Sequence, residues 1–159
     1  MIQDIAPHHF DNQYHPRPPK TDDGVLLYRK GRVYIQEDGH IPAVRELCGE
    51  DRDRLQYLFS IDERAYYTLL QEAKQLPAGY AFLALNVLRT LRVRVAAMAA
   101  VSGHQLWNWY QTHLFCGSCG RSMRADEKER MLRCDHCGNM VYPKIMPAVI
   151  VGVIHEDEI

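Results

Sequence analysis

Four cysteines in two matched pairs constrain the fold of this chain more than any other feature. The pairs are Cys116-Gly-Ser-Cys119 and Cys134-Asp-His-Cys137. Each pair can place two thiolates within about 2.3 Å of one metal ion, and two such pairs complete the tetrahedral coordination of a structural zinc site. Because no coordination position stays open for a substrate, such a site stabilises a fold and catalyses no reaction. The sequence therefore predicts one structural Zn²⁺ with Cys116, Cys119, Cys134 and Cys137 as its ligands.

The residues around the pairs agree with a two-knuckle zinc ribbon. Fourteen residues separate the pairs, and a glycine follows each of them, Gly120 and Gly138. Glycine suits the point where the chain turns back toward the sulfurs, since it adopts positive φ without steric cost. Two disulfides or a dithiol redox motif are the alternatives. However, the chain does not start with a charged and apolar signal segment, and disulfides are rare in the cytosol. We therefore expect reduced, metal-bound cysteines and a cytoplasmic location.

Other cysteine and histidine residues are not expected to bind this metal. Cys48 has no second thiol near it in the sequence, so we expect a small buried apolar residue. His113, His136 and His155 lie inside or beside the predicted ribbon. Because four thiolates already complete the coordination, we expect these histidines to face solvent or to make hydrogen bonds.

Composition indicates a water-soluble globular protein without a general affinity for nucleic acid. The chain has 159 residues, 47% of them hydrophobic, which is enough for one domain or two small ones with a real core. No apolar run approaches the roughly 20 residues that cross a bilayer. The formal net charge of −1 gives no general attraction to nucleic acid or to an anionic membrane.

The first hundred residues predict a β-rich domain followed by a helix. Residues 24–36 contain two β-prone runs around Arg29-Lys-Gly-Arg32, which is typical of a hairpin. Further β-prone segments are expected at 56–60, 65–70 and 80–88. From about residue 93 to 113 the apolar residues recur at helical spacing despite Gly103, so we expect a helix that leads into the first knuckle.

The remaining residues predict a short β-hairpin inside the ribbon and one buried strand. The continuous apolar run from Ala148 to Ile154 reads as a strand buried on both faces, which belongs inside a larger sheet. The expected fold class is α+β: a mixed β-sheet domain, a linking helix, a zinc ribbon and the first strand of a truncated further domain. The expected boundaries are 1–92, 93–113, 114–143 and 144–159.

The stretch from Gly103 to Ile154 closely resembles the zinc-ribbon NADH pyrophosphatase branch of the Nudix hydrolase family. The resemblance rests on the two cysteine knuckles, on the segment His104-Gln-Leu-Trp-Asn-Trp-Tyr before them, and on Val141-Tyr-Pro-Lys-Ile-Met-Pro-Ala-Val-Ile-Val151 after them. It covers about a third of the chain well, and residues 1–102 only by general layout. The further domain expected from residue 144 is then the start of a Nudix domain.

This resemblance implies a hydrolase that acts on a dinucleotide. Members of the family hydrolyse NADH and NAD to nicotinamide mononucleotide and AMP, and bacterial members remove an NAD cap from RNA. Their catalysis uses a glutamate-rich Nudix box that binds Mg²⁺ or Mn²⁺. The sequence contains Arg45-Glu46 and scattered acids at Glu127 and Glu129 but no such box, so we assign no catalytic residue. We expect this chain to be inactive alone, with Mg²⁺ or Mn²⁺ acting only in a full-length parent.

The resemblance also implies one substrate contact and a homodimer. The family's tyrosine after the second knuckle stacks on a base at the dimer interface, and it corresponds to Tyr142. A hydrophobic packing role beside Pro143 is the alternative for this side chain. In the family the active unit is a homodimer built partly through the ribbon, so a homodimer is expected here.

Three interpretations of the whole chain stay open at this point. The favoured one is the N-terminal and zinc-ribbon portion of an NAD(H) pyrophosphatase. The second is a zinc-ribbon module that binds nucleic acid or protein without catalysis, although the near-neutral charge argues against RNA binding. The third is a purely structural zinc-stabilised domain.

Overall fold

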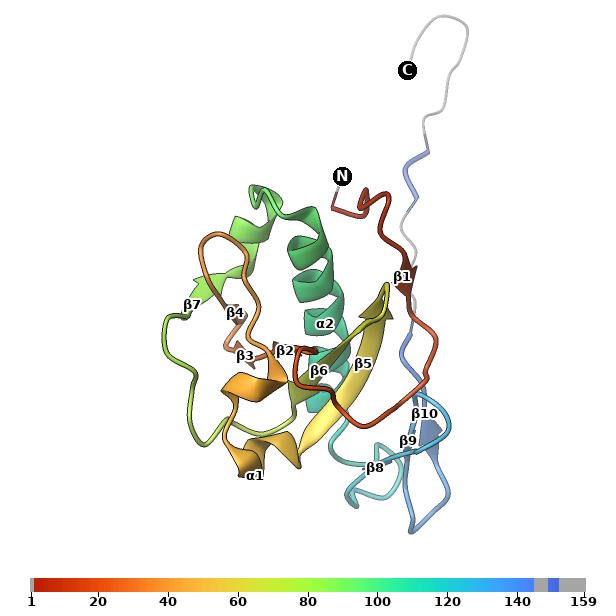
Figure 1. The fold of residues 1–159 in the computed structure, drawn as a ribbon. Coiled ribbons are helices and arrows are strands. Elements are labelled where there is room, and N and C mark those ends of the chain that lie inside the picture. Colours follow the sequence, from red (N-terminus) through yellow and green to blue (C-terminus); the bar gives the residue numbers. More distant parts are fainter. Residues whose placement is uncertain (1, 145–148, 152–159) are drawn as a thin grey trace, which may run out of the picture.

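The computed structural model describes residues 2–144 and 149–151, and it shows an α+β protein with one long helix beside several small sheets (Figure 1). The elements of the N-terminal part are β1 (Phe10–Asp11), β2 (Gly24–Leu26), β3 (Tyr28–Arg29), β4 (Arg32–Ile35), η1 (Val44–Glu46), α1 (Gly49–Arg52), β5 (Leu55–Ile61), β6 (Arg64–Leu69), β7 (Ala81–Ala84), η2 (Leu85–Arg89) and α2 (Arg94–Thr112). The ribbon contributes β8 (Arg124–Ala125), β9 (Leu132–Arg133) and β10 (Met140–Val141). The expected fold class is confirmed.

Two sheets make up the N-terminal part. One has the strand order β1-β5-β6-β2, with β5 and β6 antiparallel and β2 parallel to β6. The other has the order β3-β4-β7 and is antiparallel. The chain passes from the first sheet to the second at Leu27, between β2 and β3.

The predicted hairpin is confirmed in its second half only. Tyr28 pairs with Val33 and Arg29 with Arg32, and the intervening Lys30 and Gly31 both have positive φ, 48° and 70°. Two successive residues of positive φ form the turn whose twist matches a two-residue hairpin. The residues before Leu27 instead form β2, which pairs with β6, so the expected single hairpin from 24 to 36 is divided between two sheets.

Helix α2 covers the first sheet and supplies much of the core. It packs against β6, β5 and β2, and its alanines Ala96, Ala97, Ala99 and Ala100 are buried. Small residues on this face allow the helix to approach the strands closely. The predicted helix from 93 to 113 is therefore confirmed, and its C-terminal end leads directly into the first knuckle.

Gly103 marks the closest approach between α2 and the sheets. A Cβ atom at this position would lie 2.5 Å from Leu26 Cδ1 and 2.5 Å from the Tyr28 hydroxyl. That hydroxyl donates a hydrogen bond of 2.8 Å to the carbonyl of Ala100, one turn earlier in the helix. A glycine in the middle of a helix is therefore required here by packing rather than by backbone conformation.

Three expectations from the sequence need correction or fall outside the described residues. The segment 80–88 is a strand only at β7, and residues 85–89 form the 3₁₀-helix η2 because Leu88 turns into the core. Cys48 is not a buried apolar residue: it is half-buried, and its thiol donates to Asp51 Oδ2 at 3.2 Å. The strand expected from Ala148 to Ile154 lies largely outside the described residues, and the described Val149 to Val151 carry no strand.

No helix within residues 2–144 and 149–151 has the length and hydropathy needed to cross a membrane. The proline-containing segment from Pro16 to Lys20 contains no helix or strand. The expected division into four parts at 1–92, 93–113, 114–143 and 144–159 stays a prediction.

The close contact at Gly103 predicts the effect of its replacement. We expect Gly103→Ala to lower the free energy of unfolding by about 1–3 kcal/mol, because the methyl group overpacks the contact with Leu26 and Tyr28. The same exchange at an exposed helix position stabilises by about 1 kcal/mol. Urea unfolding followed by circular dichroism measures the change, with the exposed Gln105→Ala on the same helix as control. An unchanged or increased stability of Gly103→Ala would contradict the packing argument.

Candidate metal centre

The four predicted cysteines come together in one cluster. Their sulfur atoms all lie within 4.8 Å of one another, and this is the only potential metal-binding group found among the described residues. The shortest separations are 3.6 Å between Cys116 and Cys137 and 3.5 Å between Cys119 and Cys134. These distances exclude disulfides in this arrangement, since a sulfur–sulfur bond is about 2.05 Å long.

The separations fit the donor set of a tetrahedral zinc ion. Four sulfurs at about 2.3 Å from one metal lie roughly 3.8 Å apart, close to the shortest separations found here. Cys116 and Cys134 are buried, whereas Cys137 is exposed. The four-thiol cluster therefore suggests a structural Zn²⁺ with no open coordination position.

Each cysteine pair is shaped by a turn that repeats the same hydrogen bonds. The amide of Gly120 donates to the carbonyl of Cys116 at 2.8 Å, and the amide of Gly138 donates to the carbonyl of Cys134 at 2.9 Å. Both glycines have positive φ, 71° and 74°. The expected need for positive φ after each pair is confirmed.

Hydrogen bonds to the sulfurs favour the thiolate form at the first cysteine of each pair. Backbone amides of Cys119 and Ser118 lower the pKa of the Cys116 thiol to about 6. The amide of Cys137 lowers the pKa of Cys134 in the same way. For Cys119 the amide of Arg121 lowers the pKa, but burial and the neighbouring thiols outweigh it and raise the pKa to about 12. Without a cation, the cluster therefore holds protons that a metal would displace.

The ribbon has the short β-structure that the sequence predicts. Its strands have the order β10-β9-β8 and are antiparallel, with Leu132 opposite both Ala125 and Val141. The turn between β8 and β9 is held by Asp126, whose Oδ1 accepts the amides of Lys128 and Glu129 at 2.8 and 3.1 Å. Each strand has only two residues, so these pairings alone stabilise little.

An arginine that the sequence did not single out attaches the ribbon to the N-terminal part. Arg130 Nη1 donates to the backbone and side-chain oxygens of Asn12, each at 2.9 Å, and Nη2 donates to the carbonyl of Leu58. Its guanidinium also lies 5.6 Å from the ring centre of Tyr14. Burial lowers the pKa of Arg130, and the hydroxyls of Tyr110 and Tyr57 act in the opposite direction.

Apolar contacts reinforce this attachment. Leu132 is 4% exposed and belongs to the same core cluster as the strands and α2, and Met123 and Ala125 pack against that cluster. The Tyr14 hydroxyl donates to the carbonyl of Asp126 at 3.2 Å. These contacts join the ribbon to the main core.

Tyr142 lies on the surface of the ribbon. Its side chain is 47% exposed, and its hydroxyl donates to Glu129 Oε2 at 2.7 Å, which raises the pKa of Tyr142. Leu114, Phe115 and Met140 are also exposed on the ribbon. Half of the tyrosine surface is thus open to a stacking partner, and the hydrogen bond fixes its hydroxyl end.

His113 and His136 are not part of the cluster. His113 Nδ1 lies 2.8 Å from the carbonyl of Trp109 and 3.1 Å from the Thr112 hydroxyl, and His136 is exposed. His155 lies outside the described residues. The expectation that His113 makes hydrogen bonds and that His136 faces solvent is confirmed.

Comparison with known families identifies this ribbon. The family described as NADH pyrophosphatase zinc ribbon domain matches residues 111–142, which include all four cysteines. These residues are similar to that family. The resemblance to the zinc-ribbon NADH pyrophosphatase branch of the Nudix hydrolases is thereby confirmed.

Curated relatives of this NADH pyrophosphatase zinc ribbon extend the similarity into the N-terminal part. The chain is 31% identical over 138 residues to a protein of Deinococcus radiodurans named NAD-capped RNA hydrolase NudC, an alignment that covers 84% of this chain and 46% of the relative. Proteins of the same name from Klebsiella pneumoniae and Yersinia pestis are 42% and 46% identical over 57 residues, or 36% of this chain and 22% of each relative. The chain therefore spans less than half the length of these relatives.

The four-thiol cluster predicts the metal content. We expect one zinc per chain in reduced, folded protein, and a loss of zinc in Cys134→Ser, because three thiolates leave the tetrahedral site incomplete. Cys48→Ser is the matched control and should keep its zinc, since Cys48 is not part of the cluster. Elemental analysis of gel-filtered protein measures both. Folded wild-type protein without zinc would contradict the assignment.

The contacts of Arg130 predict its contribution to stability. We expect Arg130→Ala to lower the free energy of unfolding by about 1–3 kcal/mol, because the carbonyls of Asn12 and Leu58 lose their donors. The exposed Arg133→Ala in the adjacent strand, which changes the charge equally, should have a small effect. Chemical unfolding compares the two. Equal effects of both substitutions would show that Arg130 acts only through its charge.

Proposed function

We propose that this chain is the N-terminal and zinc-ribbon portion of an NAD(H) pyrophosphatase. The parent protein would hydrolyse NADH or NAD to nicotinamide mononucleotide and AMP, with NAD-capped RNA as a further substrate. The observation that carries the proposal is the match of residues 111–142 to the NADH pyrophosphatase zinc ribbon, together with the four-sulfur cluster inside it. The similarity to NAD-capped RNA hydrolases over 84% of the chain supports it.

Within this proposal the chain contributes structure and binding, and no chemistry. Cys116, Cys119, Cys134 and Cys137 hold a structural Zn²⁺ that forms the ribbon. The printed sequence contains no glutamate-rich Nudix box, so Mg²⁺ or Mn²⁺ would act in other parts of the parent protein. The metal there would neutralise the pyrophosphate and position the attacking water.

Tyr142 is the residue that we propose contacts the substrate. Its ring is half exposed, and Glu129 holds its hydroxyl, so one face is available to stack on a nucleotide base. The exposed Phe115 and Met140 on the same ribbon offer apolar surface for the proposed homodimer, and Phe115 is 69% exposed.

The test compares this chain with a longer protein in which the chain is followed by a Nudix domain that contains the glutamate-rich box. We call this longer protein the joined protein. With Mg²⁺ or Mn²⁺, we expect the joined protein to release AMP from NADH and the 159-residue chain alone to release none. In the joined protein, Tyr142→Ala should raise the Michaelis constant for NADH by about tenfold, the loss of one stacking contact of roughly 1–3 kcal/mol. Tyr142→Phe keeps the ring and should change it little.

The possible outcomes separate the interpretations. AMP release with an unchanged Michaelis constant for NADH in Tyr142→Ala would support the pyrophosphatase activity and would show that Tyr142 has only a packing role. A joined protein without hydrolysis that still holds zinc would favour the binding module without catalysis.

A further inference from the structure

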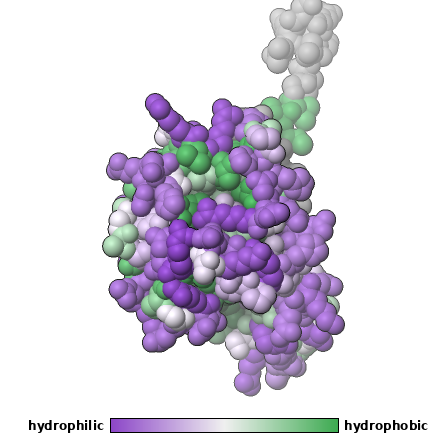
Figure 2. Space-filling model, viewed as in Figure 1, coloured by the Kyte–Doolittle hydropathy of each residue, from purple (hydrophilic) through white to green (hydrophobic). Residues whose placement is uncertain are grey.

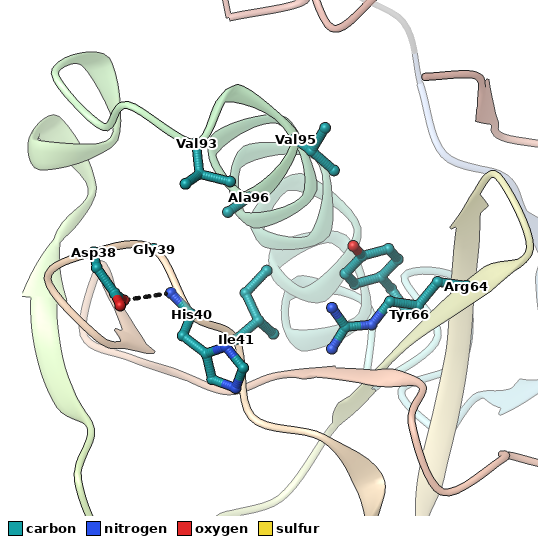
Figure 3. Close-up of a pocket in the computed structure, with 9 residues that line it drawn as sticks. All are labelled: Asp38, Gly39, His40, Ile41, Arg64, Tyr66, Val93, Val95 and Ala96. Atoms are coloured by element: carbon teal, nitrogen blue, oxygen red, sulfur yellow. Dashed lines mark hydrogen bonds between the residues drawn. The ribbon is translucent and has the colours of Figure 1, made fainter. Parts of the chain in front are cut away.

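A pocket in the N-terminal part lies away from the ribbon and has no role in the function proposed above. It has a volume of about 250 Å³ and is shown in Figure 3. Three segments line it: the loop from Asp38 to Ile41, the β6 residues Arg64 and Tyr66, and the start of α2, with Val93 just before the helix and Val95 and Ala96 in its first turn. In the view of Figure 2, a recess with hydrophobic residues at its floor lies in the upper half of the molecule, where Figure 1 shows the first turns of α2.

The pocket contains a guanidinium that no carboxylate neutralises. Arg64 makes no ion pair within the part of the chain that the structure describes, and its Nε is buried without a hydrogen-bond partner. The guanidinium lies 5.4 Å from the ring centre of Tyr66, a cation–π contact. Figure 3 shows it between Ile41 and Tyr66, directed into the pocket.

Three carboxylates that lie near Arg64 in the sequence, contact the adjacent Ala65 or line the pocket accept hydrogen bonds from other donors. Asp62 accepts from His8 Nδ1 at 2.7 Å and from the amide of His9 at 2.9 Å. Asp23, which accepts the amide of the adjacent Ala65, is paired with Arg17 at 2.7 Å. Asp38 lines the pocket, but its Oδ1 accepts the amide of His40 at 2.9 Å. A partly desolvated guanidinium without a counterion favours an anion from outside the chain.

The wall of the pocket opposite Arg64, formed by the first turn of α2, also favours an anion. The first turn of α2 carries no side-chain cap and no acidic residue. The amides of a first helical turn have no acceptor within the helix and carry partial positive charge. Val95 and Ala96 belong to this turn and line the pocket, opposite Arg64.

Asp38 and His40 are exposed polar residues of the lining, and its other members besides Arg64 are apolar. Ile41, Tyr66 and Ala96 are buried, and Val93 and Val95 complete an apolar surface next to the charged group. Gly39 has a φ of +95°, and a Cβ there would lie 2.9 Å from Leu91 Cδ2, so the loop can approach the start of α2 only with a glycine.

We propose that this pocket binds a small organic anion, with its oxyanion group on Arg64 and its apolar part against Ile41, Val93 and Val95. A phosphate monoester and a carboxylate both have this chemistry, and the pocket volume suits a body of one ring or a short branched chain. The site does not depend on the zinc ribbon or on the proposed hydrolysis, because no ribbon residue lines it.

The test follows backbone amide signals of the zinc-loaded 159-residue chain by NMR. The probes are inorganic phosphate, phenyl phosphate, benzoate and phenol. We expect saturable chemical-shift changes at Val95 and Ala96 with the anions. The affinity should be highest for phenyl phosphate or for benzoate, which each combine an oxyanion with an apolar ring. Phenyl phosphate against benzoate distinguishes a phosphate ligand from a carboxylate, and phenol reports the contribution of the apolar body alone.

Variants connect the binding to Arg64. Arg64→Gln should weaken anion binding at least about tenfold, as expected for one charge-assisted contact. Arg32→Gln, an equal charge change at an exposed strand position, should leave it unchanged. Ala96→Leu fills the pocket from the helix side and leaves the charge of Arg64 in place, so it should also abolish binding. It provides the test if Arg64→Gln does not fold.

Three results would overturn the proposal. They are the absence of saturable shifts with both phenyl phosphate and benzoate, binding of phenol as tight as that of the better of these two anions, and unchanged binding in a folded Arg64→Gln. Zinc content and NADH hydrolysis are measured separately, so a negative result here leaves the proposed function untouched.

Discussion

The close packing of four cysteine sulfurs is the constraint on which the ribbon depends. Sulfur atoms 3.5 and 3.6 Å apart cannot all carry negative charge without a cation between them, and they cannot form disulfides without moving. The strands around them have two residues each, and Cys137 is exposed. Neither backbone pairing nor burial is therefore sufficient to hold the two knuckles together. A bound Zn²⁺ would supply the attraction, and the amides that face Cys116 and Cys134 favour the thiolates that would bind it.

The knuckles in turn determine how the ribbon meets the rest of the protein. Between them, Arg130 and Leu132 reach the N-terminal part by two different interactions. Leu132 enters the main core, whereas Arg130 gives its donors to oxygens of Asn12 and Leu58, which are far away in the sequence. The guanidinium has no carboxylate partner in these contacts, so its charge is balanced by carbonyl dipoles and the face of Tyr14. The attachment therefore depends more on where the Arg130 donors lie relative to these carbonyl oxygens than on the charge of the guanidinium.

The features that the sequence predicted are those determined by neighbouring residues. The knuckles, the positive φ of Gly120 and Gly138, the turn at Lys30-Gly31 and the helix that ends at Thr112 all follow from local spacing. The division of residues 24–36 between two sheets depends on the pairing of β2 with β6, about forty residues away in the chain. The contacts of Arg130, and the lack of an ion pair for Arg64 among the described residues, could not be predicted, because they depend on residues that are distant in the sequence. Glycine at 103 looked like a defect in a helical pattern and is a packing requirement.

The attachment of the ribbon also explains how the N-terminal part can affect a surface residue of the ribbon. Tyr142 is held by Glu129, and Glu129 is joined by one peptide bond to Arg130, which is fixed on Asn12 and Leu58. Two hydrogen-bonded side chains, Arg130 and Glu129, therefore connect Leu58 in β5 with the tyrosine. In this arrangement the contacts of Arg130 place the ribbon on the N-terminal part, and a bound Zn²⁺ would hold the two knuckles together. A substrate that stacks on Tyr142 would meet a ring whose position depends on the core, although the ring itself lies outside it.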